Sequence, residues 1–328
     1  MAKPDQLGQN PWMTISSWRD RLGSARSPLV IAHRGDSFRA PENTLEAARL
    51  GFQSGAFAWE LDVHLSRDGV PVVIHDESLL RTTNVAEQFA SDPRSLSGFL
   101  VSQFLLEEIQ SLDAGSWFLS ETGGSRSALG FESLDRVPSE VVERCRSGSI
   151  RVPSLHEALQ FTRDCDWRVN IEIKSFPNPN DSIVSAVLTE VESLGISESI
   201  LISSFNHDDV AEVCRLAPRI ATGLLVDQPL FRPERYLRDV VGADCYHTSG
   251  EVAGAVSDRY RDHPSSETLR AGPLRGLLDN HCPILIYTVN DANPGGLADH
   301  LAELGVSAIF TDDPEQLVAL FRKPRNSP

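Results

Sequence analysis

The chain has 328 residues, with 30 basic and 46 acidic side chains, and therefore a formal net charge of −16. This acidic balance argues against nucleic acid or an anionic membrane surface as a partner, because both select for basic patches. The hydrophobic content of 41% suffices for a large core, and a single barrel domain can run to about 250 residues or more. We expect one main domain and a small-molecule ligand.

The five cysteines are odd in number and form no CxxC pair. This pattern argues against a disulfide framework or a structural zinc site and favours a reducing compartment. No run approaches the roughly 18 apolar residues of a membrane-spanning helix, and the polar start of the chain has no apolar segment typical of an export signal. We expect a soluble, cytoplasmic protein without stable membrane insertion.

The N-terminal residues 1–26 are expected to form a tail with one short helix. Trp12, Ile15, Trp18 and Leu22 have roughly helical spacing. This spacing predicts that the helix packs on the body of the protein.

From residue 28 onward, short apolar strands alternate with amphipathic helices, which indicates a parallel α/β sheet, either open or closed. The expected strands are 28–33, 58–65, 70–75, 168–174, 199–204, 220–226, 243–247, 284–289 and 306–311. The expected helices include 43–54, 105–112, 154–163, 181–194, 207–216, 267–280, 296–304 and 314–322.

Two regions disturb this alternation. Arg67-Asp68-Gly69 is a turn signal, so the strands on either side of it form either a hairpin or two independent members of the sheet. The stretch 77–152 lacks clean periodicity and is expected to be an insertion after the early strands, where loops often carry substrate specificity. The main domain is expected over 27–322, and 323–328 is expected to be a C-terminal tail.

Carboxylates stand on two of the apolar strands. Glu60 and Asp62 are two residues apart and therefore share a strand face, as do Glu172 and Lys174. Carboxylates are rarely buried unless they are paired or bound to a metal. Three that converge favour a hard divalent cation, Mg²⁺ or Ca²⁺, over zinc. The alternative is that each carboxylate pairs locally with an arginine or lysine.

Two of the nine histidines, His33 and His75, each end an apolar strand. Histidine is the usual proton-transfer residue near neutral pH, and two of them suit a reaction that needs one base and one acid. The alternative is an ordinary core histidine, and we interpret the other seven, such as His64 and His156, as structural or surface residues.

Two cations accompany these residues. Arg34 can bind a phosphate with two donors, and Lys174 can place a point charge on a developing oxyanion. The alternative is an ion pair with the carboxylates, and both roles can hold at once. Arg34 directly follows His33, so it faces the site only if the strand has already ended, which Gly35 favours.

The segment Pro41-Glu42-Asn43-Thr44 precedes an expected helix. Asn43 or Thr44 is expected to cap that helix. The sequence leaves the role of Glu42 open.

These residues belong to a longer series of motifs, which resembles the glycerophosphodiester phosphodiesterase family over about residues 28–320. The series runs His33-Arg34-Gly35, Pro41-Glu42-Asn43-Thr44, Glu60-Leu61-Asp62-Val63, Asp68-Gly69-Val70-Pro71-Val72-Val73-Ile74-His75-Asp76, Leu80-Arg81-Thr82-Thr83-Asn84, Asp113-Ala114-Gly115-Ser116-Trp117-Phe118, Glu172-Ile173-Lys174, Ser203-Ser204-Phe205, Thr288-Val289-Asn290 and Phe310-Thr311-Asp312-Asp313-Pro314.

The resemblance implies a TIM (β/α)₈ barrel with an insertion after the early strands. It implies metal-dependent hydrolysis of glycerophosphodiesters to an alcohol and glycerol 3-phosphate, with one divalent cation, Mg²⁺ or Ca²⁺. Carried onto this sequence, the catalytic histidines are His33 and His75, the metal ligands are Glu60, Asp62 and Glu172, and the phosphate-binding cations are Arg34 and Lys174.

Two departures from the family pattern concern the leaving alcohol. Tyr287 stands where family members often have Trp, and 119–150 is longer than usual. The alternatives on the same barrel are a lysophospholipase D or sphingomyelinase D-like phosphodiesterase, and a non-catalytic binding protein.

Overall fold

The computed structural model describes residues 17–24, 27–119, 134–175, 183–254 and 272–322. The expected tail at 323–328 lies outside these ranges. So do parts of the N-terminal tail, of the long segment 119–150 and of the helices expected at 181–194 and 267–280.

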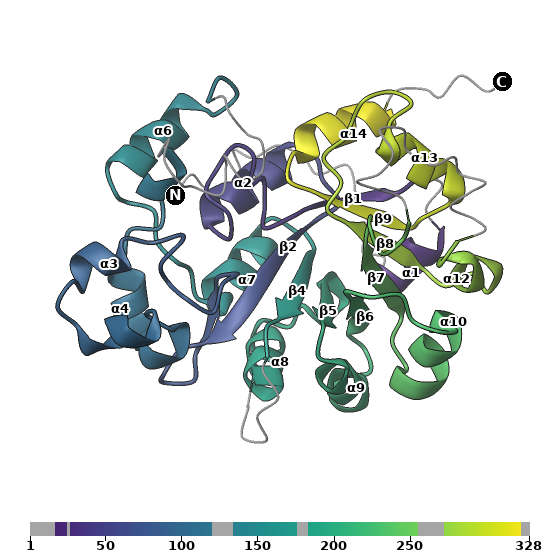
Figure 1. Cartoon of the computed structure of the whole chain (residues 1–328), viewed down its shortest axis with the longest axis horizontal. Coiled ribbons are helices and arrows are strands. Elements are labelled where there is room, and N and C mark those ends of the chain that lie inside the picture. The colour runs from purple at the N-terminus through teal and green to yellow at the C-terminus, as the bar shows by residue number, and fades with distance from the viewer. Residues whose placement is uncertain (1–16, 25–26, 120–133, 176–182, 255–271, 323–328) are drawn as a thin grey trace.

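Eight parallel strands close into a barrel (Figure 1), which confirms the predicted TIM-barrel fold. The sheet runs β1-β9-β8-β7-β6-β5-β4-β2, and β1 also pairs with β2 to close it. The barrel strands are β1 (Leu29–Ala32), β2 (Ala58–Leu65), β4 (Val169–Ile173), β5 (Ile200–Ser204), β6 (Ala221–Val226), β7 (Cys245–Ser249), β8 (Ile284–Tyr287) and β9 (Ala308–Thr311).

The ninth strand, β3 (Pro71–Val73), is the second arm of a hairpin. It pairs antiparallel with β2, with Val63 opposite Val73. The turn between the arms contains Gly69 at φ +76°, a conformation that glycine adopts at little cost. The hairpin alternative is therefore correct, and it explains how nine strand signals fit an eight-stranded barrel.

Helices surround the barrel and form part of most connections between its strands. They are α1 (Trp18–Ser24), α2 (Leu45–Gln53), α3 (Val85–Gln88), α4 (Leu106–Ser111), α6 (Ser139–Arg146), α7 (Leu155–Asp164), α8 (Ile183–Leu194), α9 (His207–Leu216), α10 (Pro233–Arg235), the π-helix η6 (Tyr236–Val241), α12 (Arg275–Asp279), α13 (Leu297–Leu304) and α14 (Pro314–Arg322). Short 3₁₀ turns occur at η2 (Pro93–Ser97), η3 (Val101–Gln103), η4 (Ser116–Leu119) and η5 (Ser197–Ser199). None of the helices in the described ranges is long and apolar enough to cross a bilayer.

Four helices were not predicted from the sequence: α3, α6, α10 and η6. Helix α6 is rich in charged residues and buries only Val141 and Cys145, so its apolar periodicity is weak. By contrast, α7 begins with a capping box, in which Ser154 and Glu157 bond each other's backbone N–H, a signature that marks a helix start in sequence.

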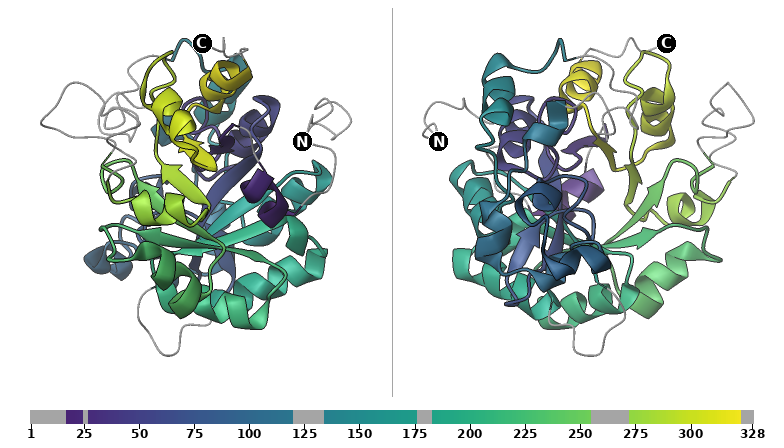
Figure 2. Two further views of the ribbon diagram at one scale, coloured as in Figure 1. Left: turned by 90° about the vertical axis from the view of Figure 1, so that its right-hand side faces the viewer. Right: turned by 60° about the vertical axis from the view of Figure 1, so that its left-hand side comes forward.

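Residues 76–114, which include α3 and α4, form an additional lobe beside the β2–β3 hairpin (Figures 1 and 2). Its small apolar core includes Leu79, Val85, Phe99 and Phe104, all buried. The lobe begins directly after His75, so its first residues border the C-terminal end of the barrel.

Helix α1 closes the opposite, N-terminal end of the barrel. Trp18 is fully buried among residues from the starts of the strands, such as Leu29 and Leu201. Its ring meets Phe57 edge-on at 5.1 Å, and its Nε1–H donates to the Ser199 carbonyl. The residues around Trp18 in this cluster are apolar, whereas the charged residues singled out in the sequence lie toward the C-terminal ends of the strands.

The buried position of Trp18 predicts a large stability loss on truncation. We expect Trp18→Ala to lower the free energy of unfolding by about 3–5 kcal/mol, because the substitution leaves a large cavity. Urea unfolding measures the loss. Leu96→Ala, at a side chain that is 94% exposed, is the control and should stay within about 0.5 kcal/mol. Equal stability of the Trp18 variant and wild type would contradict the packing described.

Candidate active site

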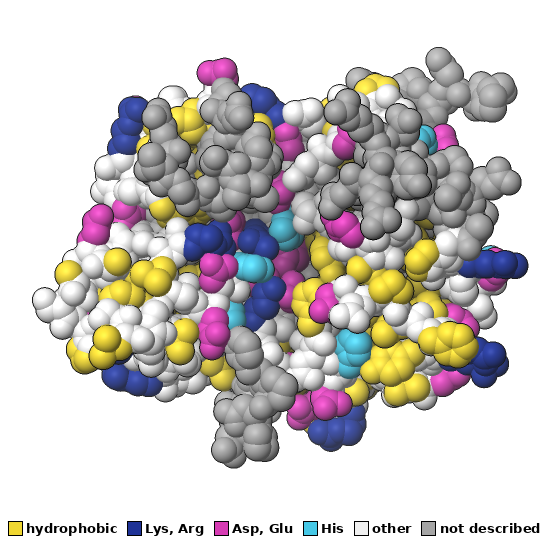
Figure 3. All heavy atoms as spheres, in the orientation of Figure 1, with side chains coloured by type: hydrophobic (Ala, Val, Ile, Leu, Met, Phe, Trp, Pro, Cys, Tyr) yellow, Lys and Arg dark blue, Asp and Glu magenta, His cyan; other side chains and the backbone are white. Residues whose placement is uncertain are grey.

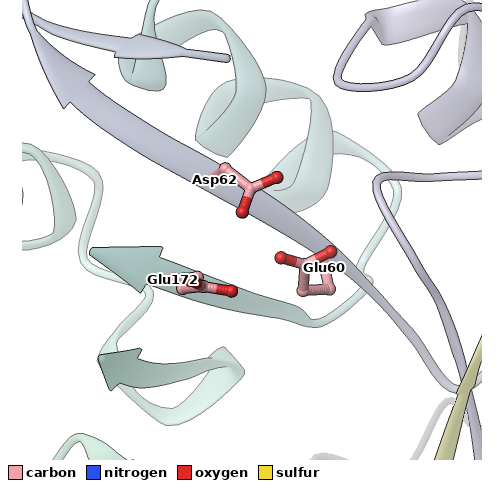
Figure 4. A group of neighbouring side chains, drawn as sticks. All are labelled: Glu60, Asp62 and Glu172. Atoms are coloured by element: carbon pink, nitrogen blue, oxygen red, sulfur yellow. The ribbon is translucent and has the colours of Figure 1, made fainter. Parts of the chain in front are cut away.

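Three carboxylates converge at the C-terminal end of the barrel. Strands β2 and β4 pair so that Asp62 lies opposite Glu172, and Glu60 lies one step deeper on the same face of β2. One side-chain oxygen from each residue lies within 4.8 Å of the other two, and Figure 4 shows the three side chains turned toward one another. Glu60 and Asp62 are buried, and Glu172 keeps 12% of its side chain exposed.

Burial and mutual repulsion set the protonation of this cluster. Burial, followed by the charges of Asp62 and Glu172, raises the pKa of Glu60 well above its ordinary value. Burial and Asp62 likewise raise the pKa of Glu172. Burial would also raise the pKa of Asp62, but the cations Lys174 and Arg34 outweigh it and hold that pKa below its usual range. Ionisation of all three carboxylates together is therefore unfavourable with only the charges that the protein supplies.

The donor atoms fit a hard divalent cation. Glu60 Oε2 accepts a hydrogen bond from the Arg34 backbone N–H at 2.8 Å, whereas the buried Oε1 has no hydrogen-bond partner within the described ranges. Oxygen-only ligands suit Mg²⁺ or Ca²⁺. A cation between the three carboxylates would satisfy Oε1 and relieve their repulsion.

Both predicted phosphate-binding cations contact these carboxylates. Lys174 Nζ lies 3.1 Å from Asp62 Oδ1 and also contacts Glu172. Arg34 Nε lies 3.4 Å from Asp62 Oδ2, and its Nη1 donates to Glu42 Oε1 at 2.8 Å. The ion-pair alternative is thus realised for both. Each side chain nevertheless keeps nearly a fifth of its surface exposed, so each can also reach a bound anion.

The end of β1 explains how Arg34 reaches the site. The strand stops at Ala32, and the backbone then turns through left-handed conformations at Arg34 (φ 55°) and Gly35 (φ 82°). A Cβ atom on Gly35 would lie 2.5 Å from the Ala47 carbonyl carbon, so the position requires glycine. The condition that the strand must end before Arg34 is therefore met.

His33 and His75 each bond a carboxylate through Nδ1. The distance from His33 Nδ1 to Asp312 Oδ1 is 2.7 Å, and the distance from His75 Nδ1 to Asp76 Oδ1 is also 2.7 Å. An ionised carboxylate can only accept, so Nδ1 carries the proton and Nε2 is left to exchange one. No bond to either Nε2 occurs within the described ranges.

The carboxylate partners of the histidines were missed in the sequence. Asp312 is buried and also accepts from Ser37 Oγ (2.9 Å) and Asn290 Nδ2 (2.6 Å). Burial would raise the pKa of Asp312, but His33 outweighs it and lowers that pKa. Asp76 directly follows His75, and Asp312 follows the last strand, so position after a strand end was the available signal for both.

In the segment 41–44, Glu42, Asn43 and Thr44 each make different contacts. Thr44 alone caps α2, through its Oγ1 and the Ala47 N–H. Of the two predicted alternatives Thr44 is therefore the cap, whereas the Asn43 side chain holds Asp62: its Nδ2 donates to Oδ2 at 2.8 Å, and its Oδ1 accepts from the Asp62 N–H at 3.2 Å. Glu42, which the sequence left open, bonds both Arg34 and Arg81.

Two cavities open at this end of the barrel. One of about 400 Å³ runs past His75, Lys174 and Phe205, and a small one of about 30 Å³ lies among His33, Glu60, Glu172 and Tyr287. Figure 3 looks onto this face, and histidine and charged side chains gather near its centre. His64 also borders the large cavity, but its Nε2 bonds the His75 carbonyl oxygen at 3.0 Å, as expected for a structural histidine.

Comparisons with known proteins point the same way. Residues 33–316 match the model of the glycerophosphoryl diester phosphodiesterase family. A glycerophosphodiester phosphodiesterase from Caldanaerobacter subterraneus is 32% identical over 299 residues, which cover 90% of this chain and 98% of the relative.

Solved structures share the fold. An Oleispira antarctica phosphodiesterase in complex with its product sn-glycerol-3-phosphate superposes with a TM-score of 0.67 at 25% identity, covering 90% of this chain and 97% of the other. A glycerophosphodiester phosphodiesterase from Agrobacterium tumefaciens has a TM-score of 0.61 at 25% identity, covering 89% and 99%.

The carboxylate cluster predicts cation-dependent stability. Saturating Mg²⁺ or Ca²⁺ should raise the free energy of unfolding of the wild type, by about 2.7 kcal/mol at a cation concentration one hundred times Kd. Glu60→Gln and Glu172→Gln should lose most of this response, because each removes a charged ligand. Unfolding in cation and in chelator measures it. Glu87→Gln, at an exposed carboxylate, is the control.

The raised pKa of Glu60 also predicts how the free energy of unfolding changes with pH, and the same Glu60→Gln variant tests the sign of this change. The pKa of Glu60 is raised in the folded state, so without cation the wild type should lose stability as the pH rises above the ordinary carboxyl pKa. Glutamine cannot ionise, so the variant in chelator should lose less over that window. An identical pH dependence of wild type and variant would contradict the burial of an ionisable Glu60.

Proposed function

The chain belongs to the glycerophosphoryl diester phosphodiesterase family, and we propose that it hydrolyses glycerophosphodiesters to glycerol 3-phosphate and a free alcohol. The observation that carries this proposal is the pairing of two carboxylate-bound histidines with a three-carboxylate cluster at one end of the barrel. The product that the Oleispira antarctica phosphodiesterase binds supports the choice of substrate.

The carboxylates Glu60, Asp62 and Glu172 would hold one divalent cation, Mg²⁺ or Ca²⁺, which when bound offsets the negative charge on the phosphate oxygens. Arg34 and Lys174 would bind the same phosphate from the protein side. Both cations are already aligned by carboxylates, so little side-chain entropy is lost when the phosphate arrives.

The two histidines would move the protons. The Nε2 of one neutral histidine accepts the proton of the attacking oxygen, and the Nε2 of the other, protonated, donates to the leaving oxygen. Asp312 and Asp76 hold each ring in the tautomer that presents Nε2, and each stabilises the imidazolium form of its partner. Both proton transfers would thus use Nε2 atoms that bond no other residue in the described part of the chain.

A reducing compartment suits this chain, and we propose the cytoplasm. None of the five cysteines, all of which fall within the described ranges, forms a disulfide. Fractionation of the producing cell, with recovery of the protein in the cytoplasmic fraction, checks this; recovery in an exported fraction would overturn it.

The proton-transfer roles predict large losses in turnover. His33→Ala and His75→Ala should each lower kcat by about 10²–10⁴-fold while the cation-induced stabilisation remains. Steady-state kinetics with glycerophosphocholine measure the loss. His156→Ala is the control, because that ring is half exposed and pairs with Glu190 on the surface. Near-normal turnover of both site variants would contradict the assignment.

A matrix of cations and substrates tests the reaction itself. After chelation, Mg²⁺, Ca²⁺ or Mn²⁺ should restore the release of glycerol 3-phosphate and an alcohol from glycerophosphocholine. Lysophosphatidylcholine is the comparison substrate for the lysophospholipase D alternative and should be the poorer one. Absence of turnover with every diester and cation would overturn the proposed function.

A further inference from the structure

Arg81 binds two carboxylates at once, on opposite sides of its guanidinium group. Its Nε and Nη2 donate to Asp76 at 2.7 and 2.8 Å, and its Nη1 and Nη2 donate to Glu42 at 2.8 Å each. Two-pronged arginine–carboxylate pairs are stronger and more directional than ordinary hydrogen bonds. Arg81 comes from the first turn of the lobe that follows β3 and is not itself one of the residues assigned to the reaction.

On one side, Arg81 fixes the carboxylate that orients His75. Asp76 has 30% of its side chain exposed and His75 has 33%, whereas the equivalent carboxylate for His33, Asp312, has 4%. Asp312 is held by neutral donors in the core, as described above. Within the described ranges the side chain of Asp76 bonds only His75 and Arg81, so its orientation depends on Arg81.

On the other side, Arg81 fixes the carboxylate that holds Arg34. Glu42 is buried, with 5% of its side chain exposed, and accepts from both Arg34 and Arg81. Burial would raise the pKa of Glu42, but the two arginines outweigh it and lower that pKa to about 2. Glu42 therefore stays ionised and links the two guanidinium groups.

These contacts form one continuous row, in the order His75, Asp76, Arg81, Glu42 and Arg34. Its two ends are the proton-transferring imidazole and the phosphate-binding guanidinium of the proposed reaction. We propose that Arg81 is a positioning residue that holds His75 and Arg34 in one rigid frame, so that the phosphate and the proton donor or acceptor keep a fixed relation. This inference rests on the proposed function for the roles of the two end residues.

The position of Arg81 predicts that its removal lowers kcat and raises KM. Arg81→Ala should lower kcat about tenfold to hundredfold, the usual effect of an outer-shell partner, and should also raise KM, because Arg34 loses its alignment. Asp76→Asn should lower kcat with little change in KM, and Glu42→Gln should act mainly on KM. Arg81→Lys should resemble the alanine variant, since an ammonium group cannot bind two carboxylates in this two-pronged way. Added guanidinium ion should restore part of the activity of Arg81→Ala, and methylammonium should not.

Arg94 offers a matched control in the same lobe. Its guanidinium also bridges two carboxylates, Asp92 and Glu108, but neither contacts a residue assigned to the reaction. Arg94→Ala should lower stability and leave kcat and KM near the wild-type values. An Arg81→Ala variant with unchanged kcat and KM, or with losses no larger than those of Arg94→Ala, would overturn the proposal.

A second readout requires no turnover. In the wild type, ¹⁵N NMR of the His75 ring should report the Nδ1–H tautomer, and Arg81→Ala should shift the ring toward a tautomer mixture while Arg94→Ala should not. An unchanged His75 signal in Arg81→Ala would overturn the positioning role. If the wild type does not cleave glycerophosphodiesters, the proposed function fails, but the NMR result still decides whether Arg81 orients His75.

Discussion

The site depends on one constraint, the burial of like charges where two neighbouring barrel strands meet. Glu60 and Asp62 on β2 face Glu172 on β4 because the parallel register places Asp62 opposite Glu172. Burying a charge costs free energy unless the charge is paired, and the contacts around the cluster offset part of that cost. Lys174 and Arg34 form ion pairs with Asp62, and Asn43 donates a hydrogen bond to it. Glu60 Oε1 nevertheless has no hydrogen-bond partner within the described ranges. A divalent cation between the three carboxylates would complete this arrangement.

The fold separates stability from chemistry along the barrel axis. At the N-terminal end, Trp18 and the first residues of the strands form a buried apolar cluster. At the C-terminal end, the same strands deliver carboxylates, histidines and cations, as is usual for TIM-barrel enzymes. The histidines have different supports, since Asp312 lies in the core while Asp76 depends on the added lobe. The lobe therefore contributes to the site in two ways: its first residues line the large cavity, and its Arg81 bonds Asp76 and Glu42.

Much of the fold could be predicted from the sequence, because short apolar runs are local signals for strands. The histidines, carboxylates and cations of the site could be predicted as well, because they stand on or directly after such runs. All nine strands carry a short apolar run, the hairpin turn carries a glycine, and charged residues follow or stand on only some of the strands. The partners of the site residues could not be predicted, because they depend on contacts between distant segments. Asp312 is 279 residues from His33, and Arg81 meets Glu42 across 39 residues. The sequence left Asn43 and Thr44 as alternative caps, because both residue types favour that position, and only the tertiary structure places Asn43 against Asp62.

Diffraction from crystals soaked with Mn²⁺ and glycerol 3-phosphate tests the central claim most directly, because manganese scatters anomalously and marks its own position. We expect an anomalous peak in contact with Glu60, Asp62 and Glu172, and a phosphate beside it that reaches Arg34, Lys174 and the Nε2 atoms of His33 and His75. A cluster without a peak at saturating Mn²⁺, or a phosphate bound away from both histidines, would contradict it.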